Sequence, residues 1–152
     1  MKNQNLPIAV LLGDPSGIGP ELICRLLNDV VTENSNIVII GDRQIFEAGE
    51  KIAKTNTDVK FIENLDEIIK NKCGKYFLDI SEGRNILHKI GECSASSGES
   101  VLRALNYALE LANQEKISAI NFGPFNKTSL HLAGNKHKDE LHFIAEKLNV
   151  SN

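Results

Sequence analysis

Ile8-Ala-Val-Leu-Leu12 and the Gly13-Asp-Pro-Ser-Gly-Ile-Gly-Pro-Glu21 that directly follows it decide the fold. The five apolar residues are typical of a strand that is buried on both faces of a parallel sheet. Pro20 and Glu21 suit the first turn of a helix, because proline lacks an N–H that would have no partner there and glutamate favours the positive end of the dipole. The stretch therefore predicts a strand, a glycine-rich turn and a helix over residues 20–31.

Strands and helices continue to alternate along the rest of the chain. Apolar residues recur at helical spacing between Val101 and Ala112, and Asn36-Ile-Val-Ile-Ile40 is a second apolar run. We expect Ser96 or Ser97 to cap the helix that contains Val101 to Ala112. The alternation predicts an α/β layered sheet in a single unit, residues 1–152. The expected strands are 36–40, 59–62, 76–80 and 119–122; the expected helices are 43–54, 97–116, 126–132 and 139–148, with a weak helical turn at 65–70.

The composition fits one soluble domain. Of the 152 residues, 41% are hydrophobic and 24% are charged, which is enough apolar material for one core. A net charge of -3 and a pI near 5.8 give no electrostatic reason to expect nucleic acid or an anionic membrane surface as a partner. Any anion site must therefore be local.

The cysteines indicate the redox compartment. Cys24, Cys73 and Cys93 are odd in number and far apart, and they form no C-x-x-C, so they predict neither a disulfide framework nor a thiolate metal site. The apolar stretch at residues 7–12 is too short for a signal peptide or a membrane span. We therefore expect a cytoplasmic protein.

The turn at residues 13–21 has two interpretations. Its backbone N–H groups and the helix N-terminus are able to hold an anion, or it is simply a tight polar connection. It has neither the G-x-G-x-x-G spacing of a Rossmann fingerprint nor the Gly-Lys-Ser/Thr of a P-loop. Asp14 is a candidate substrate-binding residue, and the alternative is that it caps the turn through the neighbouring backbone.

The full string, Gly13-Asp-Pro-Ser-Gly-Ile-Gly-Pro-Glu21, resembles the G-[DE]-P-[AS]-G-I-G-P-E signature of the 4-hydroxythreonine-4-phosphate dehydrogenase family. D-threonate and D-erythronate 4-phosphate dehydrogenases are near relatives in that family. Two later stretches agree with it in order and rough spacing, Ser96-Ser-Gly-Glu99 and Gly123-Pro-Phe-Asn-Lys127 continuing to Ala133-Gly134. The resemblance covers essentially the whole chain.

The resemblance implies an α/β/α enzyme of two domains, similar in fold to isocitrate and isopropylmalate dehydrogenases and roughly twice this length. It implies a homodimer that uses NAD and a divalent metal (zinc, magnesium or cobalt) to oxidise a phosphorylated four-carbon hydroxy acid, such as 4-phosphohydroxy-threonine or a 4-phosphorylated threonate or erythronate. The keto acid then loses carbon dioxide, and the family serves pyridoxine biosynthesis. The family's metal-ligating histidines come later than Asn152, so the resemblance implies an amino-terminal part with no metal ligands of its own.

Lys127 is the candidate catalytic residue, because it matches the family's Gly-Pro-x-x-Lys and would lie near the carboxyl end of a strand, where open α/β sheets bind ligands. The alternative is a solvated lysine in the first turn of a helix. We name no cofactor-binding residue. The chain stops at Asn152 directly after an expected helix with no further strand, which favours a fragment.

The chain departs from the family at the Gly-His-Thr-Glu motif. The family's His and Thr contact the substrate, and their positions fall on Glu140 and Leu141 here. Glutamate repels an anionic group that histidine attracts, and leucine offers no hydroxyl, so the substrate contact is altered. His137 and His142 are not at i, i+4, although Asp139 and His142 are at i, i+3; we expect solvated polar positions there rather than a metal pair.

Two other functions stay open at this level. The chain is either part of the dehydrogenase or a non-catalytic remnant or anion-binding module that keeps the fold without the metal site. A phosphate acyltransferase of similar fold is a weaker alternative, because the string at residues 13–21 argues against it.

Overall fold

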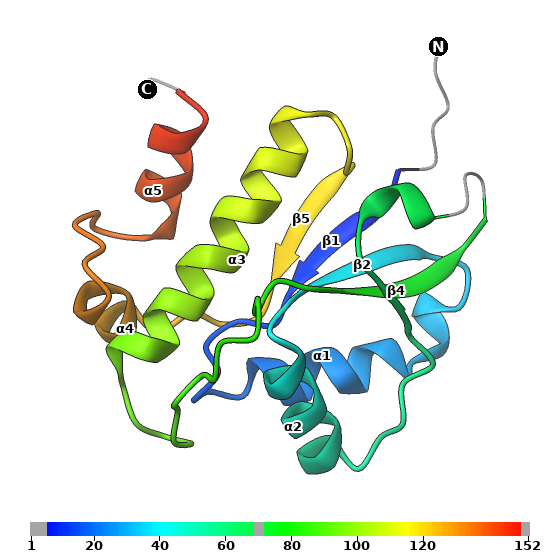
Figure 1. The fold of residues 1–152 in the computed structure, drawn as a ribbon, viewed down its shortest axis with the longest axis horizontal. Helices are drawn as coiled ribbons and strands as arrows, with labels where there is room; N and C mark the ends of the chain where they lie inside the picture. Colours follow the sequence, from blue (N-terminus) through cyan, green and yellow to red (C-terminus); the bar gives the residue numbers. More distant parts are fainter. Residues whose placement is uncertain (1–5, 69–71, 150–152) are drawn as a thin grey trace.

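A computed structural model describes residues 6–68 and 72–149. It contains a five-stranded sheet in the order β3-β4-β2-β1-β5, with every neighbouring pair parallel. Helices α1 and α2 lie on one face and α3 lies on the other, flanked by α4 and α5 (Figure 1). The strands are β1 Ile8–Leu11, β2 Asn36–Gly41, β3 Lys60–Ile62, β4 Gly74–Asp79 and β5 Ala119–Phe122; the helices are α1 Gly19–Leu27, α2 Arg43–Ala53, α3 Ala95–Asn113, α4 Lys127–Leu132 and α5 Glu140–Lys147, with 3-10 turns η1 Val30–Thr32 and η2 Leu65–Glu67. The predicted α/β/α class is confirmed.

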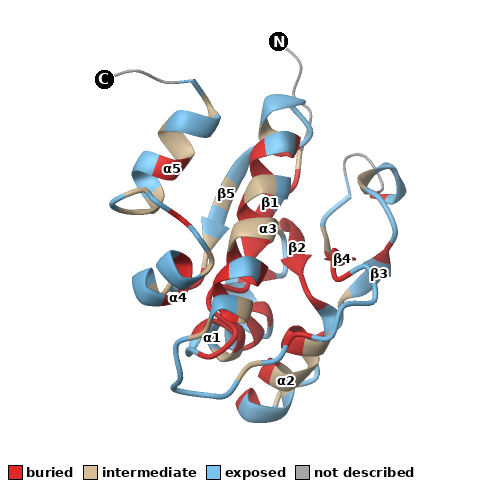
Figure 2. Ribbon diagram, turned by 60° about the vertical axis from the view of Figure 1, so that its left-hand side comes forward, coloured by how far each residue is buried: buried red, intermediate tan, exposed pale blue. Residues whose placement is uncertain are grey.

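Strand β1 is buried on both faces, as its apolar run predicts. Ala9 and Leu11 belong to the core that α3 covers, whereas Val10 and Leu12 belong to the core under α1 and α2. The alternation follows from the two-residue period of a strand. The central strands are buried and the outer surfaces of the helices are exposed (Figure 2). No helix in the described part of the chain is long and apolar enough to cross a membrane.

Helix α1 ends earlier than predicted. The sequence predicts a helix to Val31, but α1 stops at Leu27 and a separate turn, η1, follows. The Asp29 side chain accepts a hydrogen bond from the Val31 N–H at 2.9 Å, which competes with continuation of the helix. Val30 and Val31 are both largely exposed, so no core contact holds them in a helix.

Helix α3 begins before its predicted start. Ser94 caps it, because its hydroxyl accepts a hydrogen bond from the Ser97 N–H at 3.1 Å. The expectation that Ser96 or Ser97 is the cap is therefore wrong: both lie inside the first turn. The helix ends at Asn113 rather than Lys116, since the left-handed backbone at Glu115 (φ 54°) turns the chain.

The remaining elements are close to expectation. Asn126 and Asp139 cap α4 and α5 through their side chains. The predicted helical turn at 65–70 forms as η2, and residues 69 and 70 of that prediction lie outside the described part of the chain. Residues 150–152, on which the expectation of a fragment rests, lie outside it as well.

Candidate functional site

The chain reverses its direction of winding at the carboxyl ends of β1 and β5. From β1 it passes through α1 on one face to β2, whereas it reaches β5 through α3 on the other face (Figure 1). The segment that leaves β1 enters α1, whereas the segment that leaves β5 enters α4, which packs against α3, so the two diverge to opposite faces. In open α/β sheets, ligands bind outside the carboxyl ends of the strands at such a point.

Three glycines allow these two segments to touch. A Cβ on Gly19 would lie 2.2 Å from the carbonyl oxygen of Leu12, and one on Gly123 would lie 2.6 Å from the same oxygen. Gly13 has φ +84°, and a Cβ there would lie 2.8 Å from the carbonyl carbon of Gly123. The backbone around Leu12 therefore has space only for glycine at three positions.

The turn after β1 uses its own N–H groups internally. The Asp14 N–H donates to the carbonyl of Pro124 at 3.0 Å, and the Gly17 N–H donates to the carbonyl of Asp14 at 3.0 Å. The Ser16 N–H donates to Asp14 Oδ1 at 2.7 Å. The N–H groups of Asp14, Ser16 and Gly17 thus have partners within the protein and are not available to an anion.

A chain of serines ties this turn to α3. The hydroxyls of Ser16 and Ser97 are 2.8 Å apart, and the Ser94 hydroxyl donates to the Ser97 hydroxyl at 2.9 Å. The Gly91 N–H donates to the carbonyl of Ser16 at 2.8 Å. The segment that precedes α3 is thereby held beside the turn.

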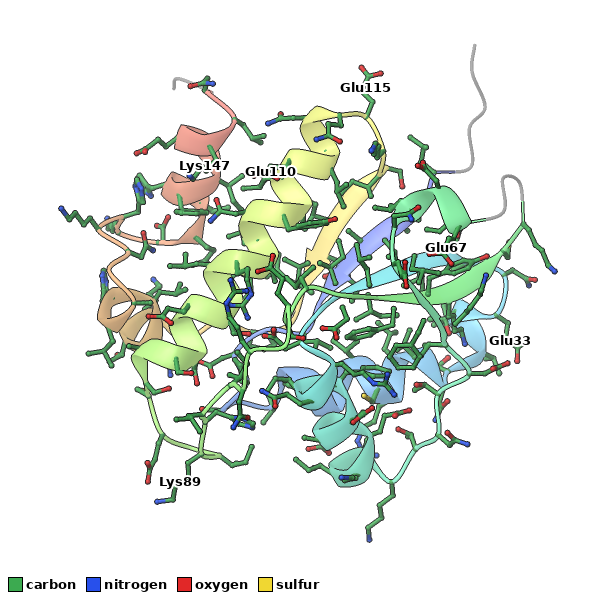
Figure 3. All side chains as sticks on the ribbon, viewed as in Figure 1. Glu33, Glu67, Lys89, Glu110, Glu115 and Lys147 are labelled. Atoms are coloured by element: carbon green, nitrogen blue, oxygen red, sulfur yellow. The ribbon has the colours of Figure 1, made fainter. Side chains whose placement is uncertain are left out.

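The turn, the β5 exit and the 91–92 segment enclose a cleft of about 310 Å³, which we call the carboxyl-edge cleft. Its charged lining residues are Asp14 and Glu92, and Glu92 pairs with Lys89. Lys89 lies at the outer tip of its segment and points to solvent (Figure 3). The ring of Phe125 stacks on Phe122 with centroids 4.5 Å apart and forms an apolar wall. The lining residues are Asp14, Ser16, Gly17, Ile18, Gly91, Glu92, Pro124, Phe125 and Asn126.

Asp14 does what the capping interpretation predicts, and one of its oxygens is left over. The residue is 3% exposed, and Oδ1 accepts the Ser16 N–H. Oδ2 is buried and has no hydrogen-bond partner among the described residues. Asp14 thus shapes the turn, and its second carboxylate oxygen is enclosed by the protein.

A second aspartate follows β2 at the place where Rossmann folds bind a ribose. Asp42 is 1% exposed, and its Oδ1 accepts from an Arg103 guanidinium nitrogen at 2.7 Å. Its Oδ2 accepts from the Ser100 hydroxyl. Both oxygens are committed to α3, so Asp42 is a structural ion pair and not a cofactor ligand. Sequence reasoning missed this pair because 61 residues separate its members.

Lys127 is the first residue of α4, directly beyond β5, and it is exposed. Its ammonium therefore lies near the carboxyl edge, as expected from its place in the sequence. It makes no ion pair with any described residue at contact distance, but its charge helps to lower the pKa of Asp139. Nothing in the structure tests its catalytic role.

Glu140 and Leu141 occupy the first turn of α5. Glu140 is half-buried and Leu141 is 68% exposed, and neither lines the carboxyl-edge cleft. Hydrogen bonds from the side chain and backbone of His142, at 2.6 and 2.9 Å, hold the pKa of Asp139 below its ordinary range. Whether Glu140 and Leu141 contact a substrate stays a prediction.

The histidines are bound to protein groups. His137 Nε2 lies 3.3 Å from Glu146 Oε2, and His142 is occupied by Asp139. His88 and His131 each place Nδ1 against a backbone carbonyl, of Ile86 and Asn135. Within residues 6–68 and 72–149, no group of three or more His, Cys, Asp or Glu side chains is arranged to hold a metal ion. These residues do not fit the metal that the resemblance implies.

Several lining residues of the cleft were not singled out from the sequence. Glu92 carries no motif of its own, Phe125 and Asn126 fall at the unspecified positions of the Gly-Pro-x-x-Lys match, and Pro124 is matched there without a role of its own. Their common signal is position: they follow β5 or precede α3, next to the carboxyl ends of the strands. A search of strand exits would have found them.

An open parallel sheet with helices on both faces and a cleft at the reversal of strand order defines a doubly wound α/β protein, a class in which ligands bind at the carboxyl edge of the sheet. Comparison with known proteins makes this more specific. The family profile of "Pyridoxal phosphate biosynthetic protein PdxA" matches residues 33–152. The chain belongs to this family. The matched residues begin after the 13–21 string, so the match does not depend on the motif that carries the resemblance.

Known proteins resemble nearly the whole chain. A Pseudomonas aeruginosa protein named "Putative 4-hydroxythreonine-4-phosphate dehydrogenase 2" is 41% identical over 97% of this chain and 44% of its own length. An Oceanobacillus iheyensis protein named "Putative D-threonate 4-phosphate dehydrogenase" is 33% identical over 94% of this chain and 43% of its own. The crystal structure of a 4-hydroxythreonine-4-phosphate dehydrogenase from Burkholderia phymatum superposes with a TM-score of 0.85 at 26% identity, over 97% of this chain and 44% of that one. The chain thus spans less than half the length of these relatives.

Proposed function

We propose that the intact protein is an NAD-dependent dehydrogenase of a phosphorylated four-carbon hydroxy acid, such as 4-phosphohydroxy-threonine or a 4-phosphorylated threonate or erythronate. The secondary alcohol gives a hydride to NAD and a proton to solvent, and the keto acid loses its carboxylate as carbon dioxide. The observation that carries the proposal is the family membership, with relatives named as 4-hydroxythreonine-4-phosphate and D-threonate 4-phosphate dehydrogenases. The proposed role is a step of pyridoxine biosynthesis.

The proposed enzyme also uses a divalent metal (zinc, magnesium or cobalt), which would polarise the alcohol. The described residues do not supply a ligand set for it. Its ligands are expected from the length of the relatives that this chain does not span.

The contribution of this chain is substrate placement. The carboxyl-edge cleft offers an apolar wall at Phe125 and polar groups at the exits of β1 and β5. Lys127 places an exposed cation beyond β5, where an anionic carboxylate or phosphate is attracted to it. The carboxylate of Glu140 and the alkyl side chain of Leu141 replace the family's His and Thr, so we propose a substrate contact that differs from the family norm.

We also propose a homodimer in a reducing cytoplasm. The family supports the dimer by resemblance. Cys24, Cys73 and Cys93 are all free thiols, and Cys73 and Cys93 are exposed, which supports a compartment that keeps thiols reduced.

Turnover by the intact protein tests the proposal. The protein is assayed for NAD reduction with 4-phosphohydroxy-L-threonine and the 4-phosphates of D-threonate and D-erythronate, with zinc or magnesium added. We expect one of these substrates to be oxidised and a chelator to abolish the activity. No turnover with any of them would reject the proposal.

The role of Lys127 is tested in the same assay. We expect Lys127→Met to lower kcat/KM about tenfold or more, because a charge-assisted contact between a cation and an anion is lost. Lys136→Met is the matched control, since Lys136 is an exposed lysine just beyond α4. Equal activity of the two variants would remove Lys127 from the site.

One observation favours a second candidate, a non-catalytic remnant that keeps the fold. No metal-binding group is assembled among the described residues. Turnover by the intact protein decides against it. We do not propose a phosphate acyltransferase, because the similar proteins named above are dehydrogenases.

A further inference from the structure

We infer that His142 accepts, through Nε2, the proton that the substrate's alcohol releases, while Asp139 holds the imidazole ring from its other side. The inference rests on the proposed function and adds a catalytic residue, His142, and a positioning residue, Asp139, to that site. The two residues lie at the start of α5, and their contacts with each other leave one nitrogen of the ring available to a ligand.

The Asp139 carboxylate fixes the imidazole ring. Its Oδ1 accepts the backbone N–H of His142 at 2.9 Å, which caps α5, and lies 2.6 Å from His142 Nδ1. An ionised carboxylate has no hydrogen to donate, so Nδ1 is the donor in this contact. The hydrogen bonds from His142 hold the pKa of Asp139 below its ordinary range, so this carboxylate is ionised at neutral pH. In the neutral ring the proton is therefore on Nδ1 and the lone pair is on Nε2.

The Nε2 end of the ring is open. The His142 side chain is 57% exposed, and Nε2 has no hydrogen-bond partner among the residues that the structure describes. A second histidine that faces a carboxylate, His137, differs in both respects, because its Nε2 lies 3.3 Å from Glu146 and its ring packs edge-on against Phe143. His142 thus combines a fixed ring with an accessible acceptor, which is the arrangement that a proton acceptor needs.

The pair lies beside the carboxyl-edge cleft. Lys127, the first residue of α4, is close enough for its charge to lower the pKa of Asp139, and the residue before it, Asn126, lines the cleft. The amino end of α5 faces α4 (Figure 1). Asp139 and Glu140 on α5 and Lys127 on α4 are the charged groups at these two helix starts. Because Lys127 is the proposed contact for an anionic group of the substrate, a substrate held there is brought next to His142.

The proposed oxidation requires such an acceptor. The carbon–hydrogen bond of the alcohol breaks as its hydride passes to NAD, and the oxygen–hydrogen bond breaks as its proton passes to His142 Nε2, so that the carbon–oxygen bond becomes a carbonyl. The ring is then an imidazolium paired with Asp139, and because it is exposed it returns the proton to solvent. The ordinary pKa of histidine lies near neutrality, which suits proton transfer in both directions.

The experiment follows NAD reduction by the intact protein across the pH range, with whichever of the phosphorylated hydroxy acids named above the wild type oxidises. We expect His142→Ala to lower kcat about a hundredfold or more, and to lose the fall in rate that the wild type shows as the base becomes protonated at low pH. Added imidazole should restore part of the rate of His142→Ala, because it supplies the missing acceptor.

Two further variants separate catalysis from structure. Asp139→Asn keeps a capping side chain for α5 but removes the charge that holds the imidazolium, so we expect a smaller loss of kcat than in His142→Ala. His137→Ala is the matched control, because it removes an imidazole that is paired with a carboxylate of the same helix. We expect His137→Ala to keep the kcat of the wild type.

Nitrogen NMR examines the ring without turnover. We expect the neutral form of His142 in the intact wild type to carry its proton on Nδ1, as the contact with Asp139 requires. A neutral ring that is protonated on Nε2 overturns the inference, since that nitrogen is then no acceptor.

The inference is also overturned if His142→Ala keeps the kcat of the wild type. It is overturned as well if His142→Ala and His137→Ala lose activity equally and imidazole restores neither, since that indicates a purely structural role for both rings. With an active wild type, these results remove this inference alone and leave the proposed function in place. If the wild type oxidises none of the hydroxy acids, the two fail together.

Discussion

Replacing Gly19 with alanine places a methyl group 2.2 Å from the carbonyl oxygen of Leu12. Real Cβ atoms essentially never come within 3.0 Å of another group, so the backbone at Leu12 or at the start of α1 must move. The backbone at Leu12 is not free to move, because the preceding carbonyl, of Leu11, accepts the Gly123 N–H at 2.9 Å and Gly123 packs closely against the Leu12 carbonyl.

The expected loss is large for a single methyl group. Overpacking of a close-packed site costs about 1–3 kcal/mol. Alanine recovers roughly 0.5–1 kcal/mol of helix propensity at most. We therefore expect the Gly19→Ala protein to lose about 2 kcal/mol of unfolding free energy, which corresponds to a fall in Tm of roughly 4–8 °C for a domain of this size.

Gly17→Ala is the control in the same turn. A Cβ there meets its nearest atoms at 3.5 and 3.7 Å, which is ordinary contact, and the residue is exposed. We expect it to stay within about 0.5 kcal/mol of wild type, or to gain slightly from a stiffer unfolded chain. Urea unfolding followed by circular dichroism measures both variants. Equal stability of the two would refute the argument that the loops at the ends of β1 and β5 meet through glycine.

Three further predictions concern buried and hydrogen-bonded groups. Arg103→Leu leaves Asp42 buried with only a hydroxyl partner, so we expect it to lower the free energy of unfolding, measured by urea denaturation, by about 3 kcal/mol. A loss below about 1 kcal/mol would contradict a buried ion pair. Burial raises the pKa of Cys24 to about 12, so this thiol should resist a thiol reagent at pH 8 until the protein unfolds. The free energy of unfolding should decline as the pH rises above 9, because the thiol of the unfolded chain ionises first. Rapid labelling of the folded protein would contradict this burial. Hydrogen bonds from His142 lower the pKa of Asp139, so NMR should find this carboxyl titrating below 3.8, and His142→Ala should raise its pKa. The stabilisation is present above the pKa of the unfolded chain and is lost as the pH falls through the pKa of the folded protein. An ordinary pKa of Asp139 in the wild type would contradict this prediction.

The strands could be predicted from the sequence because each carries its own signal. Residues 9–11 of β1 and 37–40 of β2 are buried on both faces of the sheet, and that burial leaves no polar position among them. Glycine and aspartate directly after them mark the turns. The fold class follows from such local patterns alone.

The site could be predicted only in part, because it depends on contacts between distant residues. The sequence leaves Asp14 open between a ligand contact and a turn cap; the structure shows the turn, and the unpartnered oxygen appears only when every neighbour is placed. The pairing of Asp42 with Arg103 joins two elements that share no local pattern. The cap at Ser94 was missed because three serines lie within four residues and the sequence does not say which one is extended.

The account is tested most directly by a crystal structure of the intact protein with NAD and a phosphorylated four-carbon hydroxy acid. It predicts that part of the hydroxy acid occupies the carboxyl-edge cleft, against the Phe125 ring. A complex in which both ligands are bound and this cleft holds only water would contradict it.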